Sequence, residues 1–207
     1  GVDRELARGV AFNRRFVMQD GSHKTHPGKM NAGILSPAGP EDPTVLALTF
    51  YEPEHCRPVG CLVNFACHAT HMNGVLFSAD YIKWVIDTLQ SALGPSFGVV
   101  FLNGACGDVT QVDNRSERPM VMGAYWAERT GRVVAGAALQ AIVRANPCRE
   151  ATLGIRTSNL RAAIRRSTPE MIRQAQACLS KSPVVGSNVD AVFARELLTV
   201  ERMRRKT

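Results

Sequence analysis

The stretch that decides the fold is VGCLVNFACHATHMNGVLFSADYIKWVIDTLQSALGPSFGVVFLNG, residues 59–104. It opens with an apolar run at 59–66, continues into an amphipathic segment at 79–94 and ends in a second apolar run at 97–104. Apolar residues of the middle segment recur at helical spacing, and a Gly-Pro pair marks its end. A strand, a helix and a second strand of these lengths predict a βαβ crossover with parallel strands.

The sequence on either side adds further elements. TVLALTF at 44–50 predicts a strand, separated from the next one by turn-forming residues. Residues 119–145 predict a long helix, and the alternation at 151–164 predicts another strand. Thr168 followed by proline is typical of a helix start, and a last helix is expected through 189–206.

The predicted fold class is therefore α/β, with a mixed, mainly parallel sheet flanked by helices. The apolar run at 97–104 is continuous, which is expected of a strand that is covered on both faces. Residues 11–44 are rich in Gly, Pro and Asn and predict a long irregular segment of the kind that forms functional loops. Residues 1–207 are interpreted as a single partial domain, an internal piece of a larger hydrolase domain.

Composition excludes several classes of protein. The 207 residues are 45% hydrophobic and 21% charged, which is ordinary for a globular chain. The sequence contains no run of about 18 apolar residues, so no transmembrane helix is predicted, and no signal peptide is visible. The net charge of +7 suggests nucleic acid as a partner, but the aromatic content is 6% and aromatic residues do not interleave with the basic clusters. We therefore expect solvated basic faces and no nucleic-acid partner.

The six cysteines are irregularly spaced. Cys61, Cys67 and Cys106 lie in or beside apolar runs and are interpreted as small buried side chains rather than as a disulfide framework. The oligomeric state and the redox compartment stay open at this point.

Two polar loops follow the strands of the βαβ unit: CHATHMNGVLFSAD and NGACGDVTQVDN. In parallel sheets ligands gather beyond the carboxyl ends of the strands, so both loops are expected to face one crevice. His68 and His71 are candidates for metal binding in the first loop, although with Cys61 and Cys67 they match no standard zinc pattern. The alternative for each histidine is a hydrogen-bonded structural residue.

Other candidates have equally plain alternatives. Asp108 and Thr110 follow a turn with two glycines, and either serves chemistry or caps backbone amides. Asp80 precedes the amphipathic helix, where it either caps the helix or holds a metal-bound histidine in one tautomer. His23 and His26, in the Gly/Pro-rich segment, are interpreted as surface residues.

The segment FACHATHMN at 65–73 resembles the Phe-Ala-x-His-x-x-x-Met-Asn segment of the neutral/alkaline (non-lysosomal) ceramidase family. The Ser-Ala-Asp at 78–80 resembles the Ser-x-Asp of that family, and Gly-Asp-Val-Thr at 107–110 resembles its Gly-Asp-Val-Ser-Pro-Asn. An Asn-Arg pair at 13–14 also has a counterpart upstream in the family. The resemblance covers about residues 10–115, and this part of the sequence is most similar to bacterial ceramidase-like hydrolases.

The resemblance implies a zinc-dependent amide hydrolase that acts on a lipid-like or other amide substrate, as ceramidases act on ceramide. It implies that His68 is a zinc ligand, that Thr110 stands at the position of the catalytic serine beside Asp108, and that Arg14 binds substrate and stabilises developing negative charge. Asp80 would orient the zinc-bound histidine. A secreted or periplasmic location is implied as well.

This sequence departs from the family pattern at defined points. Threonine replaces serine at position 110, Gln111-Val112 replaces Pro-Asn, and His71 replaces a serine. The other zinc ligands of the family are expected outside residues 1–207, so the fragment is expected to be inactive alone and to associate with the remainder of its domain. The alternative is a non-catalytic binding or structural module that keeps the ceramidase-like fold.

Overall fold

The structure, a computed structural model, describes residues 1–119, 122–162, 166–181 and 189–204. The chain divides into two compact units, residues 1–151 and residues 152–207. The prediction of one partial domain over the whole chain stays a prediction.

A four-stranded sheet organises the first unit. Its strands are β1 (Val2–Leu6), β6 (Thr44–Tyr51), β7 (Pro58–Phe65) and β8 (Gly98–Asn103), in the order β1-β6-β7-β8. β7 and β8 are parallel, which confirms the βαβ crossover, whereas β1–β6 and β6–β7 are antiparallel. The α/β class with a mixed sheet is thus confirmed, but antiparallel pairs outnumber the parallel pair in this sheet. Strand β1 was not predicted, because alternating charges in VDREL hide a strand at the sheet edge.

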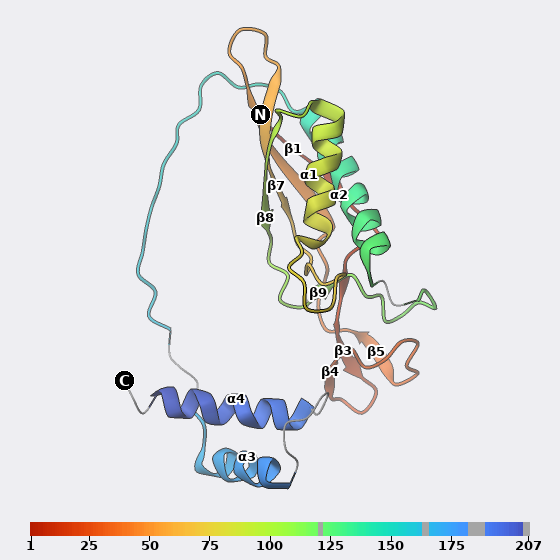
Figure 1. The fold of residues 1–207 in the computed structure, drawn as a ribbon, viewed down its shortest axis with the longest axis vertical. Coiled ribbons are helices and arrows are strands. Elements are labelled where there is room, and N and C mark those ends of the chain that lie inside the picture. Colours follow the sequence, from red (N-terminus) through yellow and green to blue (C-terminus); the bar gives the residue numbers. More distant parts are fainter. Residues whose placement is uncertain (120–121, 163–165, 182–188, 205–207) are drawn as a thin grey trace. The chain divides into compact units, whose positions relative to one another are not determined.

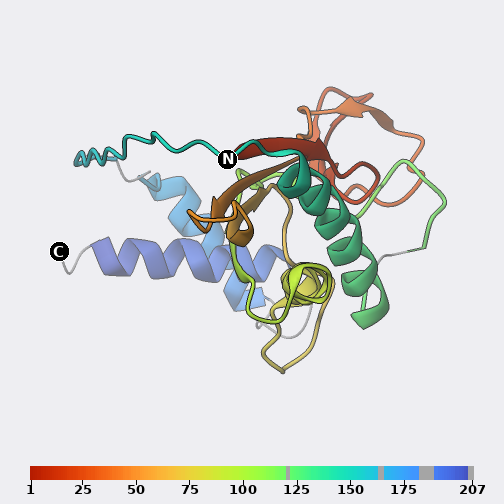
Figure 2. The same ribbon diagram turned by 90° about the horizontal axis from the view of Figure 1, so that it is seen from above.

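Two helices, α1 (Asp80–Leu93) and α2 (Ala124–Arg144), pack against each other on one face of this sheet (Figures 1 and 2). Both lie close to where the periodicity predicts them. The second helix begins later than predicted, since the described positions 119, 122 and 123 are not helical, and positions 120–121 lie outside the described residues. Gly131 is the point of closest approach: a Cβ atom there would lie 2.4 Å from the Cβ of Trp84 and 2.5 Å from the carbonyl oxygen of Tyr81. The helix pair therefore requires glycine at position 131.

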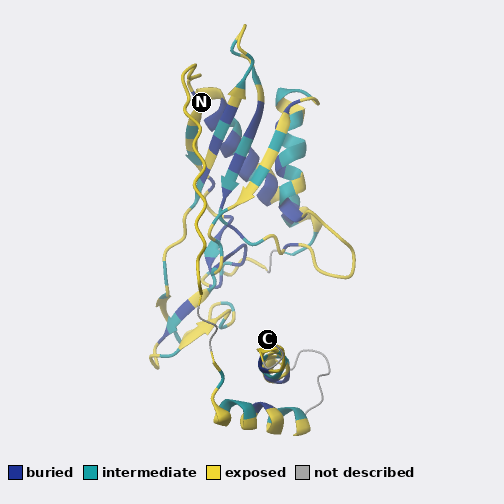
Figure 3. Ribbon diagram, turned by 90° about the vertical axis from the view of Figure 1, so that its left-hand side faces the viewer, coloured by how far each residue is buried: buried dark blue, intermediate teal, exposed yellow. Residues whose placement is uncertain are grey.

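The helix-facing side of the sheet is the core of this unit. Its strand residues Val45, Ala47, Val63 and Phe65 are fully buried. The opposite face is half-buried to exposed, and along β6 and the second half of β7 buried residues alternate with these more accessible ones (Figure 3). The prediction that the strand at 97–104 is covered on both faces is wrong for the described residues. Apolar side chains pair across all four strands of the open face, in the row Val2, Leu48, Leu62 and Val100.

The prediction of an irregular segment at 11–44 is only partly correct. The segment forms β2 (Phe12–Asn13), β3 (Arg15–Met18), β4 (His23–Thr25) and β5 (Ile34–Pro37), of which the last three make an antiparallel sheet in the order β4-β3-β5. Phe16 and Met18 are buried on one side of β3, but four alternating residues among glycines and prolines give too short a pattern to recognise. β2 pairs instead with β9 (Val109–Thr110), about a hundred positions along the chain.

The second unit is a pair of helices, α3 (Pro169–Lys181) and α4 (Val189–Arg204), that pack on each other. The hydroxyl of Thr168 accepts the N–H of Met171 at 3.2 Å, as expected of a helix cap. A strand was predicted at 151–164, but its described part, 151–162, forms no strand. The apolar side chains there are exposed, and this part of the backbone pairs with no described strand. Positions 163–164 of that strand and 205–206 of the last helix lie outside the described residues. No helix among the described residues is long and apolar enough to span a membrane.

Candidate functional site

The two-residue ladder between β2 and β9 brings distant segments of the first unit together. Phe12 pairs with Thr110, and Asn13 pairs with Val109. The backbone N–H of His68, just beyond the end of β7, donates to the carbonyl of Val109 at 3.1 Å. The ladder thus joins the Asn-Arg pair, the Gly-Asp-Val-Thr turn and the end of the histidine-bearing strand. These are the segments in which the sequence placed its candidate residues.

Arg14 is held against the turn that precedes β9. Its backbone N–H donates to the carbonyl of Asp108 at 2.7 Å, and its Nη2 donates to the carbonyl of Gly107 at 2.8 Å. Its Nε is buried and has no partner among the described residues. The carboxylate of Asp108 accepts the side-chain amide of Asn13 at 2.9 Å. Asp108 therefore fixes the backbone beside Arg14.

Thr110 is buried, and its hydroxyl donates to the side-chain oxygen of Gln111 at 2.7 Å. The same amide oxygen accepts the hydroxyl of Thr70 at 2.9 Å, and the amide nitrogen donates to the carbonyl of Thr70 at 2.8 Å. Gln111 therefore joins the histidine loop to β9 and fixes the direction of the Thr110 hydroxyl. The lone pairs of that oxygen stay available to accept a hydrogen bond from a ligand.

A cavity of about 430 Å³ opens at this point. Two predicted site residues, Arg14 and Thr110, lie on its wall together with residues from the segment after β4 and from the loop that follows β9. This volume lies within the range of about 300–1,000 Å³ that small-molecule sites occupy. The full wall comprises Arg14, His26, Gly28, Lys29, Thr70, Thr110, Gln111, Val112, Asn114 and Met122.

His68 is the predicted zinc ligand. Its Nδ1 is buried and has no hydrogen-bond partner among the described residues. An unpaired ring nitrogen of this kind is compatible with metal binding. However, the described part of the chain contains no group of three or more His, Cys, Asp or Glu side chains that could hold a metal ion. Catalytic zinc needs about three protein ligands, so the described residues do not form a zinc site by themselves.

Asp80 is bonded to His71 rather than to His68. The carboxylate of Asp80 lies 2.8 Å from Nδ1 of His71, while Nε2 of the same ring lies 2.9 Å from the hydroxyl of Thr130 on α2. The ring of His71 is completely buried. Asp80 therefore orients His71 and makes no described hydrogen bond to His68, so its predicted role beside a zinc-bound histidine stays a prediction. The two hydrogen bonds of His71 favour its interpretation as a structural residue.

The electrostatics of Asp80 follow from this arrangement. Burial alone raises the pKa of the carboxyl group, but hydrogen bonds from His71 and from the backbone N–H groups of Met72 and Tyr81 outweigh burial, and the net pKa is lowered. Asp80 also adopts a positive φ of 53°, which Asp tolerates better than most residues. Its backbone conformation and its hydrogen bonds therefore both tie the start of α1 to the histidine loop.

The cysteines of β7 and its end are structural. Cys61 and Cys67 are buried, as predicted, and burial raises the pKa of their thiols to about 11 and about 12. The hydroxyl of Tyr81 donates to the carbonyl of Cys67 at 3.1 Å. Cys106 is only half-buried, contrary to its prediction, because it lies in the turn before β9. At these pKa values the two buried thiols stay protonated near neutral pH and are poor nucleophiles.

Five polar residues of the cavity wall were not among the predicted site residues: His26, Lys29, Thr70, Gln111 and Asn114. His26, interpreted as a surface residue, is exposed, yet its backbone N–H donates to the carbonyl of Arg14 at 2.8 Å and its Nδ1 lies 3.2 Å from the side-chain oxygen of Asn114. No local motif identifies these positions. The signal that could have found His26 and Lys29 is the polar, Gly- and Pro-rich composition of residues 11–44, in which both lie.

The comparisons with known proteins concern the fold. No protein-family profile matches the chain, and no curated protein sequence matches it. Among solved structures the chain is similar to a ceramidase complexed with C2, with a TM-score of 0.53, 16% identity and coverage of 69% of this chain and 22% of that chain. It is also similar to the neutral ceramidase from Pseudomonas aeruginosa, with a TM-score of 0.50, 14% identity and the same coverage of both chains, 69% and 22%.

The chain therefore spans about a fifth of the length of these solved structures, since it covers 22% of each. The resemblance to neutral ceramidases that the sequence motifs indicate is thus present in the fold. At 14–16% identity the likeness is one of fold.

Proposed function

We propose that this chain is part of the catalytic domain of a zinc-dependent amide hydrolase of the neutral ceramidase type. The observation that carries the proposal is the β2–β9 ladder. It assembles Arg14 and Thr110 on one cavity, with His68 bonded through its backbone to the same strand. The ceramidase-like fold supports the same assignment.

Each residue has a role that its surroundings permit. Arg14 presents a fixed guanidinium group that stabilises negative charge on the amide oxygen as the carbonyl is attacked. The Thr110 oxygen, with its hydrogen directed to Gln111, accepts a hydrogen bond from the substrate or orients water. Its methyl group restricts the approach of a carbonyl carbon, so a positioning role suits Thr110 better than a covalent one. Asp108 acts through Asn13 and holds the turn.

The proposal includes zinc in the complete domain, with His68 as one ligand and the other donors from parts of the protein outside these residues. When bound, zinc polarises the amide carbonyl and lowers the pKa of a water ligand. The substrate would be a lipid-like or other amide, and the protein would be secreted or periplasmic.

The metal assignment is tested by zinc content. The full protein is expected to bind one zinc ion, and the His68→Ala variant is expected to lose it. His55 is an exposed histidine outside the cavity, so the control variant His55→Ala is expected to keep the zinc. Unchanged zinc stoichiometry in His68→Ala would contradict the assignment of His68. Circular dichroism of both variants verifies that the fold is intact.

The amidase assignment is tested by hydrolysis of acyl amides with varied head groups. We expect chelator-sensitive activity that Arg14→Gln reduces by about a hundredfold or more, in line with the loss of one oxyanion donor. Thr110→Ser is expected to retain activity, because it keeps the hydroxyl, whereas Thr110→Val removes it. Equal activity of the serine and valine variants would exclude any role for this hydroxyl.

A second candidate function is a binding or structural module that keeps the fold without the chemistry. It is favoured by the buried Thr110 hydroxyl, whose one described hydrogen bond goes to an amide oxygen and not to a base. Absence of hydrolysis in a protein that binds zinc and acyl amides would support this candidate. Chelator-sensitive hydrolysis would exclude it.

A further inference from the structure

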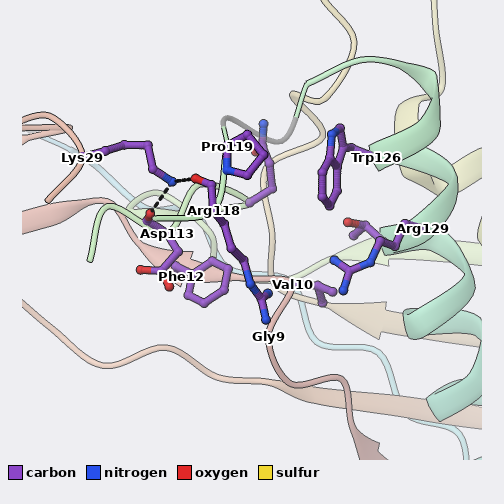
Figure 4. Close-up of a pocket in the computed structure, with 11 residues that line it drawn as sticks. Gly9, Val10, Phe12, Lys29, Asp113, Arg118, Pro119, Trp126 and Arg129 are labelled. Atoms are coloured by element: carbon purple, nitrogen blue, oxygen red, sulfur yellow. Dashed lines mark hydrogen bonds between the residues drawn. The ribbon is translucent and has the colours of Figure 1, made fainter. Parts of the chain in front are cut away.

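The cavity carries two cationic side chains, Arg14 and Lys29, that form no ion pair with the part of the chain that the structure describes. Nζ of Lys29 donates to the backbone carbonyl of Asp113 at 3.2 Å and to that of Arg118 (Figure 4). Arg14 donates to the backbone carbonyl of Gly107, and its buried Nε has no partner. Among the described residues, no ion pair includes Arg14 or Lys29.

The nearby carboxylates form no described ion pair with these cations. Asp108 accepts the side-chain amide of Asn13 at 2.9 Å, and Asp113 accepts the backbone N–H of Arg115 at 2.9 Å. Among the described residues, neither Asp nor Glu lines the 430 Å³ cavity. Because partial charges of backbone carbonyls offset only part of a full positive charge, the cavity wall has an excess of positive charge that an anion would neutralise.

More basic groups lie behind Lys29. A second, much smaller pocket of about 10 Å³ shares the Lys29 side chain and contains Arg118 and Arg129 on its wall (Figure 4). Its one acidic residue is Asp113, and it has room for about one water molecule. Arg129 lies over the ring of Trp126, at 5.3 Å from its centroid. The two arginines add to the positive potential at Lys29, and the single carboxylate of Asp113 offsets only part of it.

The remaining polar groups of the cavity wall are neutral and suit an amide ligand. The oxygen of Thr110 accepts hydrogen bonds, while Gln111 and Thr70 satisfy each other. Nδ1 of His26 is anchored to Asn114, and its Nε2 has no hydrogen-bond partner among the described residues. Nε2 can therefore bind a ligand. The neutral groups and Arg14 can bind an amide bond, whereas Lys29 selects for charge.

We propose that this cavity binds an anionic head group, a carboxylate or a phosphate, attached close to the substrate's amide bond. This inference rests on the proposed function and names its substrate class: acidic N-acyl amides, such as N-acyl amino acids, rather than uncharged lipid amides. Lys29 is the residue that determines this specificity, since Arg14 serves the amide carbonyl. Half-buried cations of this kind discriminate between ligands, because an uncharged ligand leaves them without a partner.

The test measures binding with a matched pair of probes by isothermal titration calorimetry on the full protein. N-Hexanoylglycine carries a carboxylate, and N-hexanoylethanolamine is its uncharged analogue; the phosphate ester of the latter tests the second kind of anion. We expect at least one anionic probe to bind about tenfold or more tightly than the neutral one, and expect its advantage to fall as salt rises.

Lys29→Gln is expected to lose about tenfold in affinity for the anionic probe and little for the neutral probe. Lys29→Arg, which keeps the charge, is expected to restore most of the affinity. Lys24→Gln on β4, an exposed lysine outside the cavity wall, is the matched control and should change neither. Equal binding of anionic and neutral probes, or an equal effect of Lys29→Gln on both, would overturn the proposal.

The two proposals fail in different ways. Hydrolysis of neutral and anionic amides with equal kcat/KM would leave the amidase assignment intact and refute the acidic substrate class. Selective binding of the anionic probe that depends on Lys29, with no hydrolysis of any amide, would refute the amidase assignment and support the anion site.

Discussion

Replacing His71 with alanine is expected to lower the free energy of unfolding of the first unit by about 4 kcal/mol. The hydrogen bond to the Asp80 carboxylate is of the charged type, whose loss costs about 1.5–3 kcal/mol, and the bond to Thr130 adds about 1 kcal/mol. The imidazole also packs edge-on against the ring of Tyr81 at a centroid distance of 5.8 Å, which contributes about 0.5–1.5 kcal/mol. These contributions identify His71 as a structural residue of the loop that carries His68.

His71→Asn is the informative control. Its amide nitrogen can take the place of Nδ1 and donate to Asp80, while the bond to Thr130 is lost. We therefore expect a loss of about 2 kcal/mol, roughly half the loss of the alanine variant. Urea denaturation followed by tryptophan fluorescence measures both, because Trp84 and Trp126 belong to residues 1–151. A loss below about 1 kcal/mol for the alanine variant, or equal losses for both, would refute this reasoning.

The same site predicts a pH dependence. The pKa of Asp80 is lower in the folded state than in the unfolded chain, so its contribution is fully present above the unfolded value of about 3.9. The contribution is lost as the pH falls through the lower folded value. Asp80→Asn removes this contribution, and the difference in stability between the wild type and this variant should stay constant near neutral pH and shrink below about pH 4. A difference that is unchanged at acidic pH would contradict the assignment.

Gly131→Ala is expected to destabilise the first unit by about 1–3 kcal/mol or more, while Gly136→Ala on the same helix, where an added Cβ meets nothing within 4 Å, should stabilise it by up to about 1 kcal/mol; urea denaturation of both variants measures the contrast, and equal effects would exclude the close helix contact. Cys67, with its pKa raised to about 12, should resist thiol reagents at pH 8 until the protein unfolds, whereas the exposed Cys148 reacts at once, as peptide mass spectrometry can measure. Tyr51→Phe removes the hydroxyl that donates at 2.8 Å to the carbonyl of Ala145, just after α2. The free energy of unfolding should fall by about 1 kcal/mol in the same denaturation assay. No loss of stability would mean that water replaces this hydrogen bond.

The βαβ unit was predictable from the sequence because its signals are local. The apolar faces of β7 and α1 are long enough to show their periodicity, and the helix ends at a glycine. The edge strand β1 and the short strands of residues 11–44 were not predictable in the same way. They are stabilised by pairing with partners far along the chain, and a two- to five-residue strand carries too few positions for a pattern.

The candidate site shows the same division. Arg14, His68 and Thr110 stand in recognisable motifs, whereas Lys29 reaches the cavity only because Gly28 and Met30 adopt positive φ values and the backbone N–H of Met30 donates to the carbonyl of Asn114. His71 illustrates a limit of motif reasoning. Its place beside His68 makes it one of two candidates for metal binding, but its burial and its two partners come from α1 and α2, which local sequence does not reveal.

The bond between His71 and Thr130 also determines how the histidine loop moves. Surface loops usually open at a small cost in free energy, independently of the core. Here the base of the loop is anchored to both helices: the backbone N–H of Met72 donates to Asp80 at 2.7 Å, and that of Gly123 donates to the carbonyl of His71 at 2.7 Å. These two amides should therefore exchange their hydrogens with solvent only as slowly as the helix pair itself separates, so that the base of the loop at His71 and Met72 is as rigid as the protein core, whereas the exposed residues 73–79 are not held in this way.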